Sequence, residues 1–220
     1  RVFIQLDYPP YNWTDKAKGA FEQAIFDGTI GWVGFHHATL LGDFDGFPMW
    51  NWFSDYMGDI RFHNYIAPTA SGKVVVERPE HPVMEGVSAS FTVAHEEWYT
   101  FNKSPRPNVQ VLAHVDETSY TPASDVRMGD HPAVWINPKV KARNVYFLMG
   151  HHKELLENKN FTTMFGNAIR WASGPANWFP RFRVLVHYNN KVEEAHRRFA
   201  SDGIRFFRDM TIGDGLVVDT

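Results

Sequence analysis

The sequence predicts an α/β domain built on an open parallel sheet with helices on both faces. Short apolar runs alternate along the chain with stretches of helical periodicity, and uninterrupted apolar strands are typical of parallel sheets buried on both faces. Of the 220 residues, 44% are hydrophobic and 21% are charged, the balance of a globular protein. A chain of this length is expected to form one domain, spanning 1–220.

The opening residues predict a strand, a helix and a second strand. The apolar run 2–6 predicts a buried strand, which is followed by Asp7. Thr14 is a candidate N-cap for a helix that Asp27 and Gly28 end. The run 30–35 predicts another buried strand, and it ends at two histidines.

The middle of the chain is less regular. Residues 47–57 predict a short helix rich in aromatic side chains, which either pack in the core or offer flat rings to a sugar. Three apolar stretches predict further strands, at 74–76, 109–115 and 134–136. We find no internal repeat and no low-complexity segment.

The alternation is clearest near the C-terminal end. The run 145–149 predicts a strand, and an apolar face between Phe161 and Ala172 predicts a helix capped by Gly174. A proline-containing linker follows. Beyond it the pattern predicts a strand at 182–186, a helix from about 192 to 207 and a strand at 217–218.

Composition excludes several classes of function. The chain has no cysteine, which excludes disulfides, thiolate metal sites and a cysteine nucleophile. A net charge of −3 gives no broad positive electrostatic field that would attract nucleic acid, so we expect no nucleic-acid partner. No apolar run is long enough for a membrane span. We find no signal peptide in the chain, so cytoplasm and periplasm both stay open.

Four stretches in order resemble motifs of one known family. They are GWVGFHHAT at 31–39, the segment from His81-Pro82 to Glu96-Glu97-Trp98-Tyr99, Arg143 to His151, and NAIRWA at 167–172. Together they resemble the ThuA-like family, named for trehalose utilisation. Glu96 stands where that family usually has Asp, and Lys141-Ala142 stands where a glycine often precedes the arginine.

The resemblance implies a fold of flavodoxin type, similar to class I glutamine amidotransferases. In such sheets ligands bind outside the carboxyl ends of the strands. The amidotransferases carry a cysteine nucleophile in the turn where this chain has His36, so the resemblance implies the location of the site but not its reaction. It also implies a small-molecule carbohydrate as partner, either trehalose or a related, including oxidised, glycoside. A homo-oligomer is compatible with the sequence.

The order of the segments differs from that of the family. The strand–helix–strand unit that should come first resembles 181–220, while 1–174 resembles the main part of the sheet. A circular permutation, a piece of two tandem domains, or segments given out of native order would each explain this. The opening in mid-strand favours the last explanation, and all three give the same site.

Polar side chains that follow the predicted strands are the candidate site residues. We expect His36 and His151 to carry acid–base chemistry, with Glu97 as partner carboxylate. The same three residues are candidate ligands of a divalent metal, because imidazole and carboxylate suit zinc, manganese or iron. The candidates for substrate binding are His196, His63, Tyr99, Asp7 and His37.

Two other functions compete with a sugar-processing enzyme. The first is a non-catalytic carbohydrate-binding or sensing domain that kept the amidotransferase-like scaffold without its nucleophile. It predicts ligand binding without consumption. The second is a protein-interaction domain that uses the aromatic residues, and it predicts a large apolar surface patch away from the histidines.

Overall fold

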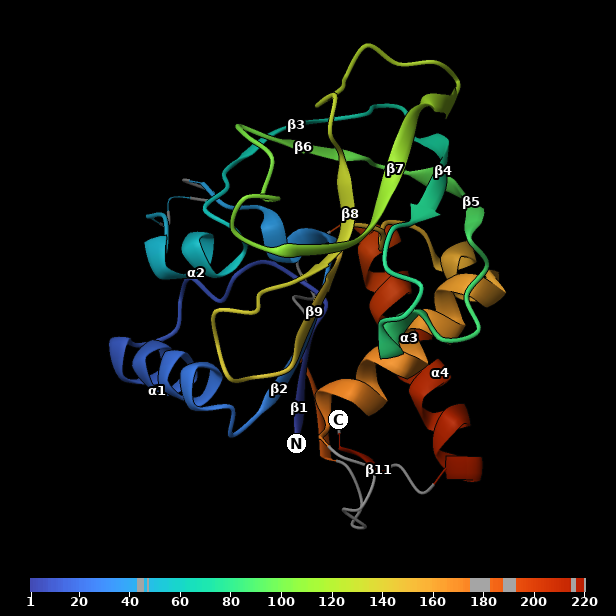
Figure 1. Ribbon diagram of the computed structural model, residues 1–220. Coiled ribbons are helices and arrows are strands. Elements are labelled where there is room, and N and C mark those ends of the chain that lie inside the picture. The colour runs from blue at the N-terminus through green and yellow to red at the C-terminus, as the bar shows by residue number, and fades with distance from the viewer. Residues whose placement is uncertain (43–45, 47, 175–182, 188–192, 215–216, 220) are drawn as a thin grey trace.

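A computed structural model describes the chain except for residues 43–45, 47, 175–182, 188–192, 215–216 and 220. Its described strands form a nine-stranded sheet, in the order β11-β10-β1-β2-β9-β8-β7-β4-β5, and a small sheet of β3 and β6 (Figure 1). The strands are β1 (Val2–Gln5), β2 (Gly31–Phe35), β3 (Phe62–Tyr65), β4 (Ala70–Val76), β5 (Ser90–Glu96), β6 (Tyr99–Phe101), β7 (Gln110–Thr121), β8 (Pro132–Ile136), β9 (Asn144–Phe147), β10 (Arg183–His187) and β11 (Val217–Asp219). The α-helices are α1 (Asp15–Asp27), α2 (Asn51–Tyr56), α3 (Lys159–Ala172) and α4 (Glu194–Asp214).

Five neighbouring strands, β11, β10, β1, β2 and β9, run parallel. Counted from β10, their order across the sheet is 2-1-3-4-5, which is the flavodoxin order. The expected α/β class and flavodoxin-like sheet are therefore confirmed. The carboxyl ends of β1, β2 and β9 meet at one edge of this sheet.

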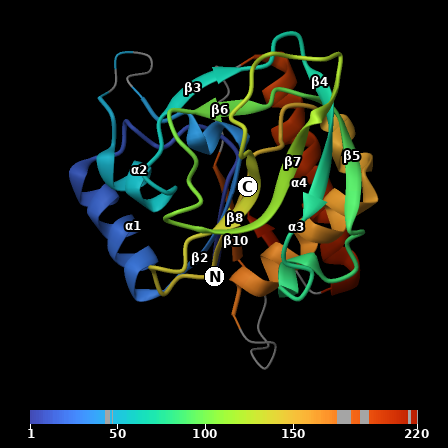
Figure 2. The same ribbon diagram turned by 45° about the horizontal axis from the view of Figure 1, so that its top comes forward.

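Helices cover both faces of the parallel strands, with α1 and α2 on one side and α3 and α4 on the other (Figures 1 and 2). Successive side chains of a strand point to opposite faces of the sheet, so each strand contributes side chains to the packing against both pairs of helices. On one face Trp32 packs against Tyr56 of α2, with ring centroids 5.3 Å apart. On the other face Phe35 packs against Phe165 of α3 at 4.6 Å and Phe199 of α4 at 6.0 Å.

The predicted ends of α1 are confirmed. The side chain of Thr14 accepts a hydrogen bond from the Ala17 N–H, and Gly28 closes the helix with a left-handed φ of 73°. The aromatic rings around α2 belong to the core, because Trp50, Phe53 and Tyr56 are all buried.

The second half of the sheet differs from the parallel sheet that we expected throughout. Strands β8, β7, β4 and β5 pair antiparallel with one another, and β8 also pairs antiparallel with β9. The connections between these strands carry 3₁₀ turns and loops in place of crossover helices, and only a crossover can return the chain to a parallel neighbour. The small sheet of β3 and β6 lies beside this half (Figure 2).

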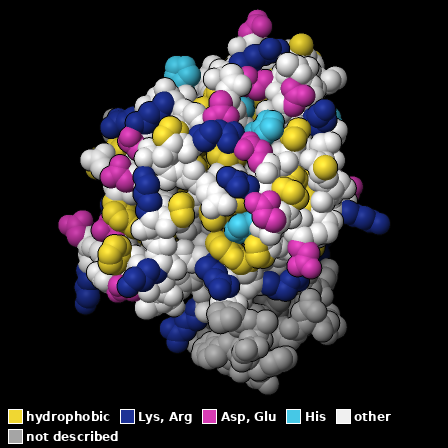
Figure 3. Space-filling model, viewed as in Figure 1, with side chains coloured by type: hydrophobic (Ala, Val, Ile, Leu, Met, Phe, Trp, Pro, Cys, Tyr) yellow, Lys and Arg dark blue, Asp and Glu magenta, His cyan; other side chains and the backbone are white. Residues whose placement is uncertain are grey.

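The surface carries both signs of charge. On the face shown in Figure 3, acidic and basic side chains are interspersed. Each helix in the described part of the chain is too short or too polar to cross a membrane.

Candidate functional site

The site lies where β2 and β9 end side by side. His36 follows β2 directly and has a φ of 37°, so the chain turns sharply into a 3₁₀ helix there. Gly150 comes shortly after β9 and lies close to His36. A Cβ on Gly150 would lie 2.9 Å from the Cβ of His36. This contact explains the glycine, because any side chain at position 150 would push the two strand ends apart.

The hydrogen bonds of His36 fix its protonation state. Its Nδ1 lies 2.9 Å from the carbonyl oxygen of Leu148. A carbonyl can only accept, so Nδ1 carries the proton and Nε2 presents a lone pair. The His36 ring is buried and stacks on Tyr99, with centroids 4.1 Å apart.

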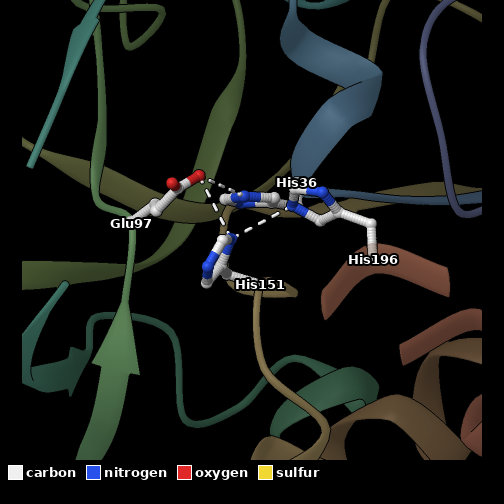
Figure 4. Close-up of side chains that lie close together, drawn as sticks. All are labelled: His36, Glu97, His151 and His196. Carbon is white, nitrogen blue, oxygen red and sulfur yellow. Dashed lines mark hydrogen bonds and ion pairs between the residues drawn. The ribbon is translucent and has the colours of Figure 1, made fainter. Parts of the chain in front are cut away.

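Three more side chains converge on His36, as Figure 4 shows. Its Nε2 lies 3.5 Å from Oε2 of Glu97, and the same carboxylate oxygen lies 3.1 Å from Nδ1 of His151. That Nδ1 is 3.0 Å from Nε2 of His196, which α4 contributes. One ligand atom from each of the four residues lies within 4.8 Å of the others, a group that could hold a metal ion.

Glu96 organises the backbone beneath this group and was not among the candidate site residues. Its buried carboxylate accepts hydrogen bonds from the backbone N–H of Gly150 at 2.9 Å, of His151 at 3.2 Å and of Glu97 at 3.0 Å. It therefore ties the turn after β9 to the end of β5. The signal in the sequence was the pair of adjacent glutamates, but nothing in the sequence indicated which side chain turned inward.

Burial and mutual contact shift the pKa values of the cluster in different directions. Burial lowers the pKa of His36, and burial together with the neighbouring histidines lowers the pKa of His196 to about 2. Burial opposes ionisation of Glu97, but the contacts of its carboxylate with the His151 and His36 imidazoles outweigh it and hold its pKa well below the usual range. Burial also opposes charging of His151, yet Glu97 raises the pKa of that imidazole. Glu97 is thus a carboxylate beside neutral His36 and His196.

A second pair adjoins the cluster. Nδ1 of His37 lies 3.2 Å from Oδ1 of buried Asp7, which follows β1. The ring of His37 lies against that of His196, with centroids 3.8 Å apart. The hydroxyl of Tyr99 donates a long hydrogen bond of 3.5 Å to Glu97.

His63 is the candidate that the structure does not bring to the cluster. It is exposed on β3, outside the group of four ligand-bearing residues. From the sequence we predict a loop over residues 58–65, whereas Phe62–Tyr65 form strand β3. Its proposed contact with substrate stays a prediction.

Comparison with known proteins gives consistent matches. The sequence model of the ThuA family, described as trehalose utilisation, matches residues 1–172. A ThuA-like protein from Bacteroides uniformis has a similar structure, with 34% identity and a TM-score of 0.66 over 78% of this chain and 68% of that one. A ThuA-like protein from Parabacteroides merdae shares the fold at 17% identity, with a TM-score of 0.57 over 77% of this chain and 69% of that one. The search of curated proteins found no match.

Proposed function

The chain belongs to the ThuA family of trehalose utilisation, and we propose that it processes trehalose or a related, including oxidised, glycoside at the cluster of His36, Glu97, His151 and His196. The observation that supports this is the convergence of three imidazoles and one carboxylate at the carboxyl edge of the parallel strands. Ligands of open α/β sheets bind at this edge.

The residue types suit chemistry at a sugar oxygen. An imidazole with a free lone pair takes a proton from a hydroxyl, and a charged imidazole returns one to a leaving oxygen. The same nitrogens and the Glu97 carboxylate also suit a metal that polarises such an oxygen. Both mechanisms use the same four residues, and both act on hydroxyl, carbonyl or glycosidic oxygens.

Two other reaction types have less support. Glutaminase chemistry through a thiol is excluded because the chain has no cysteine. Two-carboxylate glycoside hydrolysis needs a second free carboxyl group across the bond that breaks. Glu96 is the nearest carboxylate to Glu97 in the chain, and its oxygens already accept three backbone N–H groups. It is not free to act as the second carboxylate.

The test is turnover by the purified chain. Trehalose, related disaccharides and their keto derivatives would be incubated with the protein, and the products followed by chromatography and mass spectrometry. We expect consumption of at least one of these sugars. We also expect His36→Gln and Glu97→Gln to lower turnover by about 100-fold or more, as loss of proton transfer or of a metal ligand does.

His95→Asn is the matched control. This histidine is exposed and has a φ of 53°, a conformation that asparagine tolerates, so turnover should stay unchanged. Full activity in both cluster variants would overturn the proposal. Binding of a sugar by calorimetry, with no consumption of any, would instead assign a carbohydrate-binding domain.

A further inference from the structure

We propose that His36, Glu97, His151 and His196 bind one divalent transition-metal ion through three imidazole nitrogens and one carboxylate oxygen. The proposal concerns the site of the proposed function and deepens it. Its evidence is the geometry of the four side chains, and it can be tested without any sugar.

The spacing of the ligand atoms fits a metal ion. Zinc–nitrogen and zinc–oxygen bonds of about 2.0–2.1 Å in a tetrahedron place neighbouring ligand atoms about 3.3 Å apart. The measured separations are 3.5 Å between His36 Nε2 and Glu97 Oε2, 3.1 Å between that oxygen and His151 Nδ1, and 3.0 Å between His151 Nδ1 and His196 Nε2. Three edges of the group thus lie within a few tenths of an ångström of the expected value.

His36 has the features of a metal-binding histidine. Such residues usually donate their second ring N–H to a carbonyl or carboxylate, which fixes the tautomer and the ring plane. Here Nδ1 of His36 donates to the Leu148 carbonyl. The opposite nitrogen, Nε2, is fully buried and makes no hydrogen bond with the part of the chain that the structure describes. A buried lone pair left without a donor is costly, and a cation between it and Glu97 would satisfy it.

The second pair of histidines leads to the same conclusion. Nδ1 of His151 and Nε2 of His196 lie 3.0 Å apart, so in the absence of a cation one of these nitrogens donates a hydrogen bond to the other. With a cation, both lone pairs have a common acceptor. The other nitrogen of His196, Nδ1, is buried without a hydrogen bond to any described residue and lies 3.8 Å from the carboxylate of Glu193.

The donor set restricts the kind of metal. Imidazole and carboxylate suit Zn²⁺, Mn²⁺ and Fe²⁺, whereas Ca²⁺ and Mg²⁺ prefer oxygen donors. No thiolate is available anywhere in the chain. When bound, the ion would act as a Lewis acid toward a sugar oxygen.

The first experiment is elemental analysis of the untagged 220-residue chain, purified without chelator. Titration of the metal-free protein with Zn²⁺ and with Mn²⁺ follows. We expect close to one metal ion per chain and saturable binding. In His36→Gln and Glu97→Gln, affinity should fall by more than about 100-fold, beyond what loss of an outer hydrogen-bond partner costs. His95→Asn should bind as the wild type does.

Two further measurements keep this test decisive. Thermal melting of each metal-free variant shows whether it folds. The visible absorption of the Co²⁺-substituted wild type reports nitrogen and oxygen ligands even where a variant does not fold. The proposal would be overturned if the metal-free wild type bound neither ion. It would also be overturned if both cluster variants bound the metal as tightly as the wild type does.

The outcomes for metal and for sugar are separable. Turnover of a glycoside by a protein that binds neither Zn²⁺ nor Mn²⁺ would refute the metal site and leave the proposed function standing. Stoichiometric metal binding without turnover of any glycoside would support the metal site and refute the proposed function.

Discussion

The cluster depends on a residue that does not belong to it. Glu96 is buried, and its charge is satisfied by backbone N–H groups on both sides of the site. Charged hydrogen bonds of this kind are stronger than neutral ones. The position of His151 relative to His36 therefore rests on this carboxylate.

Glu96→Gln should destabilise the protein by about 1–3 kcal/mol. The amide group would turn N–H donors toward the N–H groups of Gly150 and His151, so that at least one donor is left unsatisfied. Urea unfolding measures the loss. Glu154→Gln, at an exposed carboxylate, should stay within about 0.5 kcal/mol of the wild type. Equal stability of the two variants would contradict the role assigned to Glu96.

At the residue scale, the sequence predicted much of the cluster but not its support. His36 and His151 follow strands, and a parallel sheet brings such residues to one edge. Glu96 was missed because regular alternation from the buried residues Phe91 and Val93 would point the Glu96 side chain outward. The structure breaks that alternation with a bulge at His95, which has a φ of 53°. A bulge depends on tertiary pairing, so the local pattern does not reveal it.

At the scale of elements, the parallel half was predicted, whereas in the other half strands were predicted but their antiparallel direction was missed. The parallel strands are continuous apolar runs separated by amphipathic helices, and both signals are local. In β4 and β7, buried and exposed positions are mixed. The strand direction there is set by partners far away in the chain. The missing helical periodicity between residues 77 and 109 was the available signal for antiparallel pairing.

The close packing of β2 on α3 can be tested at one glycine. A Cβ on Gly31 would lie 2.1 Å from the carbonyl oxygen of Ala172, and a backbone atom cannot move away cheaply. Gly31→Ala should destabilise the protein by about 1–3 kcal/mol. The control is Gly19→Ala, inside α1, where nothing lies within 4 Å. It should stabilise by about 0.5–1 kcal/mol. Thermal and urea unfolding of both variants would check the opposite signs, and equal effects would refute the packing argument.

An ion-pair network links the loops of the antiparallel half. Arg106 donates to both Glu77 and Asp130. Hydrogen bonds from this guanidinium hold the pKa of each carboxyl below its usual value. A carboxyl group with a depressed folded pKa stabilises the protein above its unfolded pKa, and this contribution is lost as the pH falls through the folded value.

Glu77→Gln should therefore reduce stability near neutral pH and lose its effect in acid. The difference from wild type should shrink as the pH falls below 4.5, the ordinary value for glutamate. The ion pairs are partly open to solvent, so the difference should be of the order of 1 kcal/mol and should also shrink in high salt. Urea unfolding across pH would measure it, with Glu80→Gln, at an exposed ion pair, as the control. A constant difference at all pH values would contradict this account.

At the scale of the whole molecule, the site combines distant parts of the chain. His36, Glu97 and His151 lie within residues 1–172, which match the family, while His196 comes from α4 beyond them. The flavodoxin order of the sheet counts β10 as its first strand, although β10 follows β9 and α3 in the chain. That 181–220 supplies the first unit of a single domain stays a prediction. The docking of α4 against the sheet then determines whether the fourth side chain reaches the others.

Phe199 is the residue at which this dependence can be tested. It lies one turn after His196 on the same face of α4, is 3% exposed, and packs against Phe35 at the end of β2. Phe199→Ala should lower stability by about 3–5 kcal/mol. It should also weaken Zn²⁺ binding, because α4 would no longer hold His196 beside His151. Arg198→Ala removes an exposed neighbour on the same helix and should change neither property. Urea unfolding and calorimetric titration with Zn²⁺ measure the two effects. A destabilised Phe199→Ala protein that binds Zn²⁺ as tightly as the wild type would show that the docking of α4 is not needed for the site.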